Sequence, residues 1–181
     1  RYLIAPLAND YASSPGTLNA GSTLVDRVRC QLQGGGRTAY AGSLDSARAQ
    51  LNTNGRAGVQ KVIVFLSDGA ANYGGNFEPS QYRTQPCRAG IDAAARAKAD
   101  GTLIYAIGYD LDGSNGVYQA CLTRSNALEA PGLNARQAME RIASDPLTFF
   151  NQTAPTQLRT VFRQIAADIF RTAQLIDDSL S

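Results

Sequence analysis

The residues best suited to chemistry in this sequence are an aspartate and a threonine that each lie close to glycine. Asp68 follows five consecutive apolar residues in the turn Ser67-Asp68-Gly69, and Thr38 follows three glycines and an arginine. A carboxylate at the end of a buried strand stands where ligands bind in open α/β sheets, so Asp68 is a candidate ligand-binding residue. The simpler interpretation is that Asp68 caps a turn in which Gly69 supplies a positive φ.

The apolar run Val62–Leu66 predicts the strand that positions Asp68. Apolar residues without alternation are typical of a strand covered on both faces, as in the centre of a parallel sheet. The run stops at Ser67, so Asp68 lies at the carboxyl end of the strand, where ligands bind in open α/β sheets. The glycines before Thr38 let the backbone approach a neighbour closely, and Thr38 begins a helix.

Strand and helix patterns alternate along the chain. Strands are predicted over residues 1–7, 62–66, 102–108 and 147–150, and loops over 9–21 and 70–85. Apolar spacing and capping residues predict helices over about 22–32, 39–52, 84–100, 117–123, 133–143 and 154–173, followed by a short polar tail. This alternation predicts an α/β fold with a mainly parallel sheet. Because two strands read as fully buried and each needs neighbours on both sides, a piece of the sheet is expected to be missing.

Composition excludes several classes of function. The 181 residues carry a formal net charge of +2, without a long block of like charges, which argues against nucleic acid and anionic membranes as partners. No stretch is apolar for long enough to span a bilayer. Histidine is absent, which excludes Ser-His-Asp and Cys-His catalysis and most catalytic zinc sites. No repeat or composition break divides the chain, so residues 1–181 are treated as one domain.

The three cysteines, Cys30, Cys87 and Cys121, are too scattered for a zinc cluster or a CxxC redox pair. Their number is compatible with one disulfide and one leftover thiol.

Together these patterns resemble the von Willebrand factor A family. The likeness rests on a helix opened by Gly-Gly-Gly-Arg-Thr, a buried strand that ends in Ser-Asp-Gly, and a later strand at Tyr105–Gly108, and it covers Arg1 to about Asp178. It implies a doubly wound, mainly parallel sheet flanked by helices, with a metal-ion-dependent adhesion site at one edge. That site combines Asp-x-Ser-x-Ser, a Thr after a Gly-rich turn, and an Asp in a Thr/Ser-Asp-Gly turn. Thr38 matches the second piece and Asp68 the third.

The first piece of this motif does not precede Thr38. Arg1–Leu7 resembles the family's third strand, so the likeness implies a partial domain that lacks its first strand, first helix and second strand. Another chain or the missing N-terminal part would then supply the motif; the alternative is a degenerate site. A literal match at Asp177–Ser181 lies after a helix at the wrong end and would need a circular permutation.

The resemblance implies a non-enzymatic module that binds or adheres to a protein. Mg²⁺, or Mn²⁺ or Ca²⁺, held by Thr38 and Asp68 would accept an acidic side chain of the partner, provided that the missing motif is supplied. The expected rim of this partner-binding surface lies in the neighbouring loops and consists of Gly36, Arg37, Ser67, Gly69, Asn72, Tyr73 and Asp110.

Finer features are similar to the bacterial branch of Tad/Flp pilus-assembly, TadG-like envelope proteins. These features are Cys87 in the helix after the first buried strand, Cys121 after the second, and a closing helix with Phe162, Ile165 and Ala166. The likeness implies a Cys87–Cys121 disulfide. It also implies an extracytoplasmic location: the protein would lie in the cell envelope or at the cell surface, or it would be secreted. The alternative is that both cysteines are buried free thiols. Cys30 would be a core thiol or paired with the missing part.

Two other functions stay open at this point. A structural subunit of a surface appendage or envelope complex would tolerate an incomplete metal site. A nucleotide-dependent or metal-dependent enzyme is the weakest candidate, because Gly34–Thr38 lacks the Lys-Ser/Thr of a P-loop and is no GxGxxG. No paired catalytic carboxylates are evident either.

Overall fold

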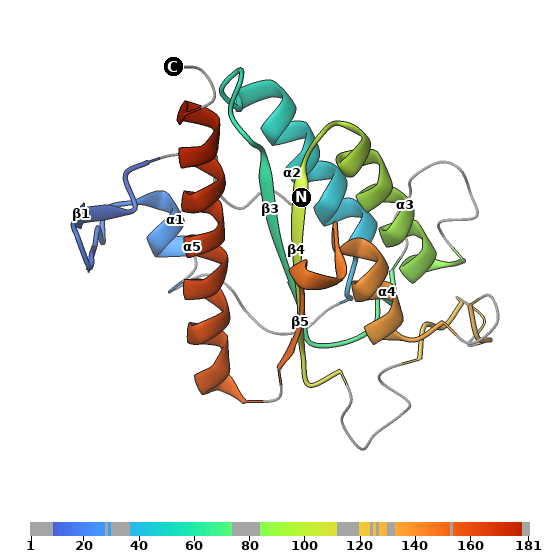
Figure 1. Cartoon of the computed structure of the whole chain (residues 1–181). Helices are drawn as coiled ribbons and strands as arrows, with labels where there is room; N and C mark the ends of the chain where they lie inside the picture. Colours follow the sequence, from blue (N-terminus) through green and yellow to red (C-terminus); the bar gives the residue numbers. More distant parts are fainter. Residues whose placement is uncertain are drawn as a thin grey trace.

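A three-stranded parallel sheet lies at the centre of the structure (Figure 1). The computed structural model describes residues 9–27, 29, 37–73, 84–111, 120–123, 125, 127–129, 133–152 and 154–178. The strands of the sheet, in their spatial order, are β3 (Val62–Ser67), β4 (Leu103–Tyr109) and β5 (Phe149–Gln152). The register aligns Ser67 with Gly108 and Gly108 with Asn151. The three strands therefore end together, at what is called the carboxyl edge below.

Helices cover both faces of the sheet (Figure 1). One face carries α2 (Tyr40–Asn54), α3 (Pro86–Ala99) and α4 (Ala135–Ile142), and the other carries α5 (Pro155–Asp178). The first three helices share a core cluster with Ile63 of β3 and Ile104 of β4. α5 buries Val161 and Ile165 against Tyr105 and Ile107 of β4. This arrangement confirms the predicted doubly wound α/β fold.

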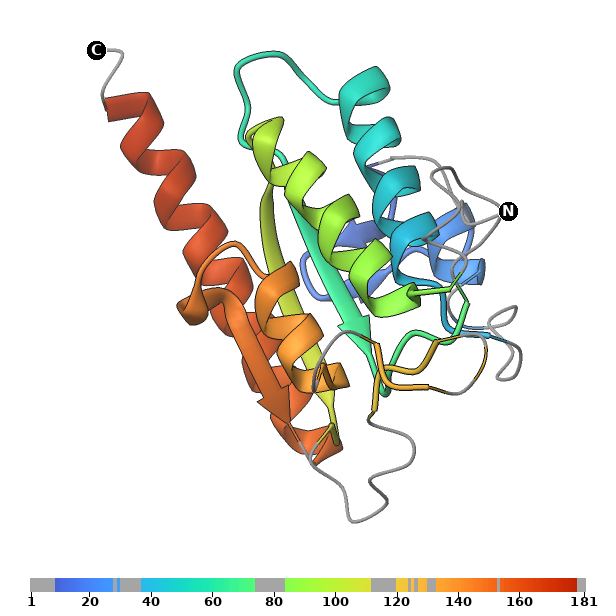
Figure 2. The same ribbon diagram turned by 90° about the vertical axis from the view of Figure 1, so that its right-hand side faces the viewer.

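α2 and α3 lie side by side, as Figure 2 also shows. Alanines and a glycine make up most of the buried face of α3, so the two helices approach closely. Two ion pairs join them: Arg48 Nε lies 2.6 Å from Asp100 Oδ2, and Arg96 Nη2 lies 2.8 Å from Asp45 Oδ2. Both helices were predicted from the sequence, and their bounds differ from the prediction by one or two residues.

β3 has one open face, which contradicts the prediction that both faces are covered. Ile63 is 7% exposed, and Phe65 packs against the core under α2 and α3. On the other face Val64 and Leu66 are 41% and 49% exposed, because the cluster under α5 lies over β4 and β5 and includes only Val62 of β3. Among the described residues, β3 is also an edge strand, with a ladder to β4 alone. β4 itself is buried on both faces, as predicted.

The region before α2 differs from its prediction. The predicted loop over 9–21 contains a short antiparallel hairpin, β1 (Ala12–Ser14) and β2 (Thr17–Leu18), whose Pro15-Gly16 turn has a glycine φ of 80°. Of the helix predicted over 22–32, the described residues include α1 (Thr23–Asp26). The strand predicted over residues 1–7 lies outside the described residues.

The second half departs from its prediction at three points. The described part of the helix predicted over 117–123 is extended, because Ala120 and Leu122 form β-bridges. β5 starts later than predicted, after the 3₁₀ turn η3 (Pro146–Thr148), which Asp145 caps through a 2.8 Å bond from the Leu147 N–H. α5 continues to Asp178 rather than ending near residue 173, since no glycine or proline interrupts it.

Candidate functional site

Two segments are joined by hydrogen bonds at the carboxyl edge of the sheet: the loop after β3 and the residues that lead into α2. The N–H of Thr38 donates to Asn72 Oδ1 at 2.7 Å. The carbonyl of Thr38 accepts from the N–H groups of Asn72 at 2.9 Å and Tyr73 at 3.1 Å. Asn72 stands four residues after Asp68. The structure thus brings together the segments that carry the two predicted metal ligands.

Asp68 is exposed, whereas buried side chains hold the turn that carries it by hydrogen bonds. Ser67 is buried, and its hydroxyl donates to the Gly69 carbonyl at 2.9 Å. The hydroxyl of Tyr40 donates to the same carbonyl. In the described part of the chain, the Asp68 carboxylate has no hydrogen-bond or ion-pair partner, and Gly69 does not have a positive φ. These observations do not support the simpler interpretation of Asp68 as a turn cap.

Tyr40 is the buried support of this turn. Its side chain is 1% exposed, and its ring packs edge-on against Phe65 with 5.2 Å between the ring centroids. Burial, assisted by the negative charge of Asp68 and opposed by a hydrogen bond with Ser67, raises the pKa of Tyr40 to about 12. The hydroxyl therefore keeps its proton at physiological pH and stays a donor.

We expect the free energy of unfolding to fall as the pH rises from about 10 to about 12. The pKa of an unfolded tyrosine is about 10, so in this window the folded state holds a proton that the unfolded state has lost. Each pH unit in the window then costs about 1.4 kcal/mol. Urea unfolding of the wild type and Tyr40→Phe at about pH 9 and about pH 11 measures this. Equal slopes in the two proteins would contradict the assignment.

The predicted rim residues lie around the joined segments where the structure describes them. The Arg37 guanidinium is exposed and lies 5.6 Å from the centroid of the Tyr73 ring, within the range of a cation–π contact. The side-chain oxygen of Asn72 accepts a hydrogen bond from the Thr38 N–H. Asp110 follows β4, is exposed and has a φ of 53°. Gly36 lies outside the described residues.

An open pocket of about 330 Å³ lies beside Asp68 at the carboxyl edge. Its walls are Leu66, Ser67, Asp68, Tyr109 and Leu158. Leu66 belongs to the open face of β3, so the pocket continues into exposed apolar surface at Val64. The sequence did not predict this pocket, because its walls come from β3, β4 and α5, which are distant in the chain.

The donors at the edge fit a hard cation in type but supply only part of a coordination shell. Thr38 offers one neutral hydroxyl and Asp68 one carboxylate, whereas Mg²⁺ takes about six ligands and Ca²⁺ about six to eight, all oxygen. Among the described residues, no group of three His, Cys, Asp or Glu side chains could hold a metal ion. A complete site therefore needs water or further residues as ligands.

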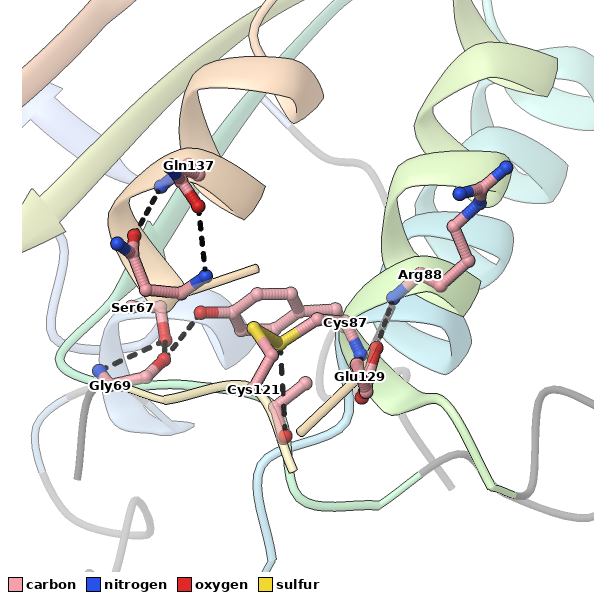
Figure 3. Close-up of a disulfide and its surroundings, with 10 residues drawn as sticks. Ser67, Gly69, Cys87, Arg88, Cys121, Glu129 and Gln137 are labelled. Carbon is pink, nitrogen blue, oxygen red and sulfur yellow. Dashed lines mark hydrogen bonds between the residues drawn. A yellow bond between two sulfur atoms is a disulfide. The ribbon is translucent and has the colours of Figure 1, made fainter. Parts of the chain in front are cut away.

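The Cys87–Cys121 disulfide is confirmed (Figure 3). Its Cα atoms are 5.9 Å apart, and both residues are fully buried. Cys87 lies in the first turn of α3, and its sulfur lies 3.9 Å from the carbonyl oxygen of Ala71, three residues after Asp68. The disulfide therefore anchors the loop around Cys121 beside the candidate site. Cys30 lies outside the described residues.

Glu129 is a structural residue that sequence reasoning missed. It is fully buried, and its two oxygens accept from the N–H of Cys87 at 3.0 Å and the N–H of Arg88 at 2.9 Å (Figure 3). Because no local side chain caps α3, this distant carboxylate takes that role. Burial raises the pKa of Glu129, and the two hydrogen bonds oppose the shift. A single glutamate in a loop gives no sequence pattern for such a contact.

Replacing Glu129 with glutamine is expected to lower the free energy of unfolding by about 1–3 kcal/mol. An amide accepts hydrogen bonds through one atom only, so its NH₂ group would face an N–H donor of α3. Urea unfolding measures the loss. Glu140→Gln is the matched control, because Glu140 is exposed and pairs with Arg136 at 3.0 Å on the surface of α4. Equal losses in the two variants would show that Glu129 is no cap.

The comparison with protein-family models matches residues 13–164 to the von Willebrand factor type A domain. No curated protein matches the chain. Among solved structures, the pilus adhesin SpaC from Lactobacillus rhamnosus GG is similar with a TM-score of 0.61 and 19% identity over 85% of this chain and 22% of that chain. The vWF domain of the type V pili tip protein Mfa5 from Porphyromonas gingivalis has a TM-score of 0.61 and 20% identity over 83% of this chain and 73% of that chain.

These likenesses show a shared fold. The chain spans about a fifth of the SpaC chain, so the similarity concerns one domain of that adhesin. The family match includes α2, the whole central sheet and Asp68, and it covers most of the 181 residues. The chain belongs to the von Willebrand factor type A domain family.

Proposed function

We propose that this domain is a non-enzymatic adhesion module that binds a protein partner at the carboxyl edge through a divalent cation. The observation that carries the proposal is the joining of Thr38 and Asp68 by hydrogen bonds between their segments, with the Asp68 carboxylate exposed. Thr38 and Asp68 match the second and third pieces of the family's metal motif. Around them, Arg37, Tyr73 and Asp110 form the proposed rim.

The proposed ion is Mg²⁺, with Mn²⁺ or Ca²⁺ as substitutes. When bound, it would act as a Lewis acid that accepts a carboxylate oxygen from an Asp or Glu of the partner. Thr38 and Asp68 would hold it, and an Asp-x-Ser-x-Ser supplied by another chain or another part of the domain would add the remaining protein ligands. A neutral hydroxyl and one carboxylate leave such an ion electron-poor, which favours an acidic partner.

The open edge of β3 supports the proposal that another strand joins this sheet. The Leu103 N–H donates to the Lys61 carbonyl at 2.9 Å, so the odd-numbered residues of β3 face β4. The backbone groups of Val62, Val64 and Leu66 then point away from β4, and no described residue hydrogen-bonds to them. Edge groups that no described residue pairs, beside exposed apolar side chains, are a template for strand addition.

The proposed adhesive function implies a location at the cell surface or in the cell envelope. The two similar structures are described as a pilus adhesin and as a pili tip protein. A buried disulfide is typical of proteins in oxidising, extracytoplasmic surroundings. No helix in the described residues has the length and apolar content needed to cross a membrane. The pilus proteins and the disulfide support the proposal that the domain lies in the envelope or on the surface of a bacterium, as the resemblance to the TadG-like branch implies.

A structural subunit of a surface appendage is the second candidate. The exposed face of β3 favours it, because packing into a complex would cover this face. The small number of metal ligands, Thr38 and Asp68, also favours it, because a structural subunit does not need a complete metal site.

Calorimetry with Mn²⁺ and acetate tests the proposed function, using acetate as a probe for an acidic side chain. We expect one Mn²⁺ per protein, displaced by Mg²⁺, and acetate binding to the Mn²⁺-loaded protein that disappears in EDTA. Acetate binding that is unchanged in EDTA would refute the metal-bridged contact. Absence of Mn²⁺ binding at millimolar concentration, even with a peptide that contains Asp-x-Ser-x-Ser added, would favour the structural subunit.

A further inference from the structure

We infer that Tyr40 is the positioning residue of the candidate metal site: its buried hydroxyl fixes the turn that carries Asp68 and couples this turn to the residues that carry Thr38. The inference rests on the proposed function for the nature of the site. The contact between Tyr40 and the turn exists without a metal, so it is tested separately from metal binding below.

The first step is the convergence of donors on the turn. The Gly69 carbonyl accepts from the Tyr40 hydroxyl and from the Ser67 hydroxyl at 2.9 Å. The return contact, from the Gly69 N–H to Ser67 Oγ, is long at 3.4 Å. Ser67 belongs to the turn itself, so its bond cannot fix the turn relative to another element. Tyr40 lies on α2, and its bond therefore sets the orientation of the Gly69–Ala70 peptide, directly after Asp68 and Gly69, relative to that helix.

The second step is the confinement of the Tyr40 side chain. The ring is 1% exposed and packs edge-on against Phe65 of β3. On its other side, α3 carries a glycine, and a Cβ at Gly90 would lie 2.5 Å from the Cβ of Tyr40 and 3.0 Å from its Cδ2. Real Cβ atoms do not approach so closely, so the absence of a side chain at Gly90 is what makes room for this ring. A ring held in this way keeps its hydroxyl on one acceptor.

The third step is the link to Thr38. Tyr40 is the first residue of α2 and stands two residues after Thr38. The backbone of Thr38 is bonded to Asn72 and Tyr73, which follow the Asp68 turn. The bond from Tyr40 to Gly69 and the bonds from Thr38 to Asn72 thus connect the same two segments at two points close to the ligand positions. Movement of one ligand would break a bond that holds the other, so the two are preorganised as a pair.

The contrasting interpretation is that Tyr40 is a core residue whose hydroxyl merely finds an acceptor. That role predicts a loss of stability when the hydroxyl is removed, with no specific change at the turn. The positioning role predicts faster opening of the turn and weaker metal binding. A measurement of stability therefore does not distinguish the two interpretations of Tyr40. The test measures the opening of the turn and the affinity for the metal instead.

The test compares Tyr40→Phe with Tyr105→Phe, which removes the hydroxyl of another buried tyrosine, on the face of the sheet that packs against α5. Amide hydrogen exchange is followed over residues 67–72, and Mn²⁺ affinity is measured by calorimetry. We expect Tyr40→Phe to speed exchange at the turn and to weaken Mn²⁺ binding, each by about three- to ten-fold, as loss of one hydrogen bond implies. Tyr105→Phe should change neither.

Unchanged exchange at residues 67–72 in Tyr40→Phe would overturn the inference, even if stability fell. If the wild type bound no Mn²⁺ but exchange rose in Tyr40→Phe alone, the proposed function would fail, while the hold of Tyr40 on the turn would be supported. Should Tyr40→Phe not fold, Gly90→Ala takes its place, because it keeps every polar group but pushes the ring. Normal exchange at the turn in Gly90→Ala would then overturn the inference.

Discussion

Replacing Asp68 with alanine is expected to lower Mn²⁺ affinity at least about 100-fold, because loss of a direct ligand should exceed the tenfold to 100-fold effect of outer contacts. The fold should survive, since Asp68 is exposed and makes no contact within the described residues that stabilises them. Exposed substitutions of this kind change stability by about 0.5 kcal/mol or less. Calorimetry gives the affinity, and urea unfolding gives the stability.

Asp92→Ala is the matched control for this prediction. Asp92 is a carboxylate on α3 that pairs loosely with Arg88 at 3.6 Å, away from the carboxyl edge. Its removal should leave Mn²⁺ binding unchanged. If Asp68→Ala bound Mn²⁺ as tightly as Asp92→Ala, Asp68 would not be a ligand, and its exposure at the end of β3 would have no bearing on metal.

Removing the disulfide with Cys87→Ala should lower the free energy of unfolding by about 4 kcal/mol. The bond closes a loop with a sequence separation of 34 residues, and constraint of the unfolded chain by a loop of this size contributes about that much. Both cysteines are fully buried, so alanine is a better replacement than serine, which would bury an unpaired hydroxyl. Chemical unfolding with and without a reductant measures the effect.

Two comparisons make the disulfide prediction specific. Cys87→Ala and the double variant with Cys121→Ala should be almost equally unstable, because either change breaks the same bond. Cys30→Ala keeps the bond and should not share this loss. A reductant should weaken the wild type but not the double variant. If Cys87→Ala were as stable as the wild type under oxidising conditions, the two cysteines would be free thiols in the native protein.

The parts of the fold that the sequence predicted well are those that depend on local pattern. The apolar run that ends at Ser67 and the Ala-rich stretch after Pro86 have the periodicity and end signals of β3 and α3, so their positions follow from nearby residues. Thr38 and Asp68 were assigned by resemblance to a motif, and the structure joins their segments at one edge. The Cys87–Cys121 pair was likewise implied by resemblance and is confirmed.

The parts that the sequence did not predict depend on contacts between distant residues. The sequence predicted Tyr40 only as one residue of an apolar helix face. Nothing near it in the sequence shows that its hydroxyl reaches Gly69, 29 residues away. Glu129 caps a helix from 42 residues away. The exposure of Val64 and Leu66 follows from where α5 packs, which the composition of β3 cannot reveal.

The central claim, that Thr38 and Asp68 hold a divalent cation, is tested most directly by the anomalous scattering of Mn²⁺ in crystals of the protein grown with MnCl₂. The account predicts a peak between the Thr38 hydroxyl and the Asp68 carboxylate, at about 2.0–2.6 Å from each ligand oxygen or bridged to it by one water. No peak at this position, or Mn²⁺ bound elsewhere on the domain, would contradict the account and leave the carboxyl edge as a contact surface without a metal.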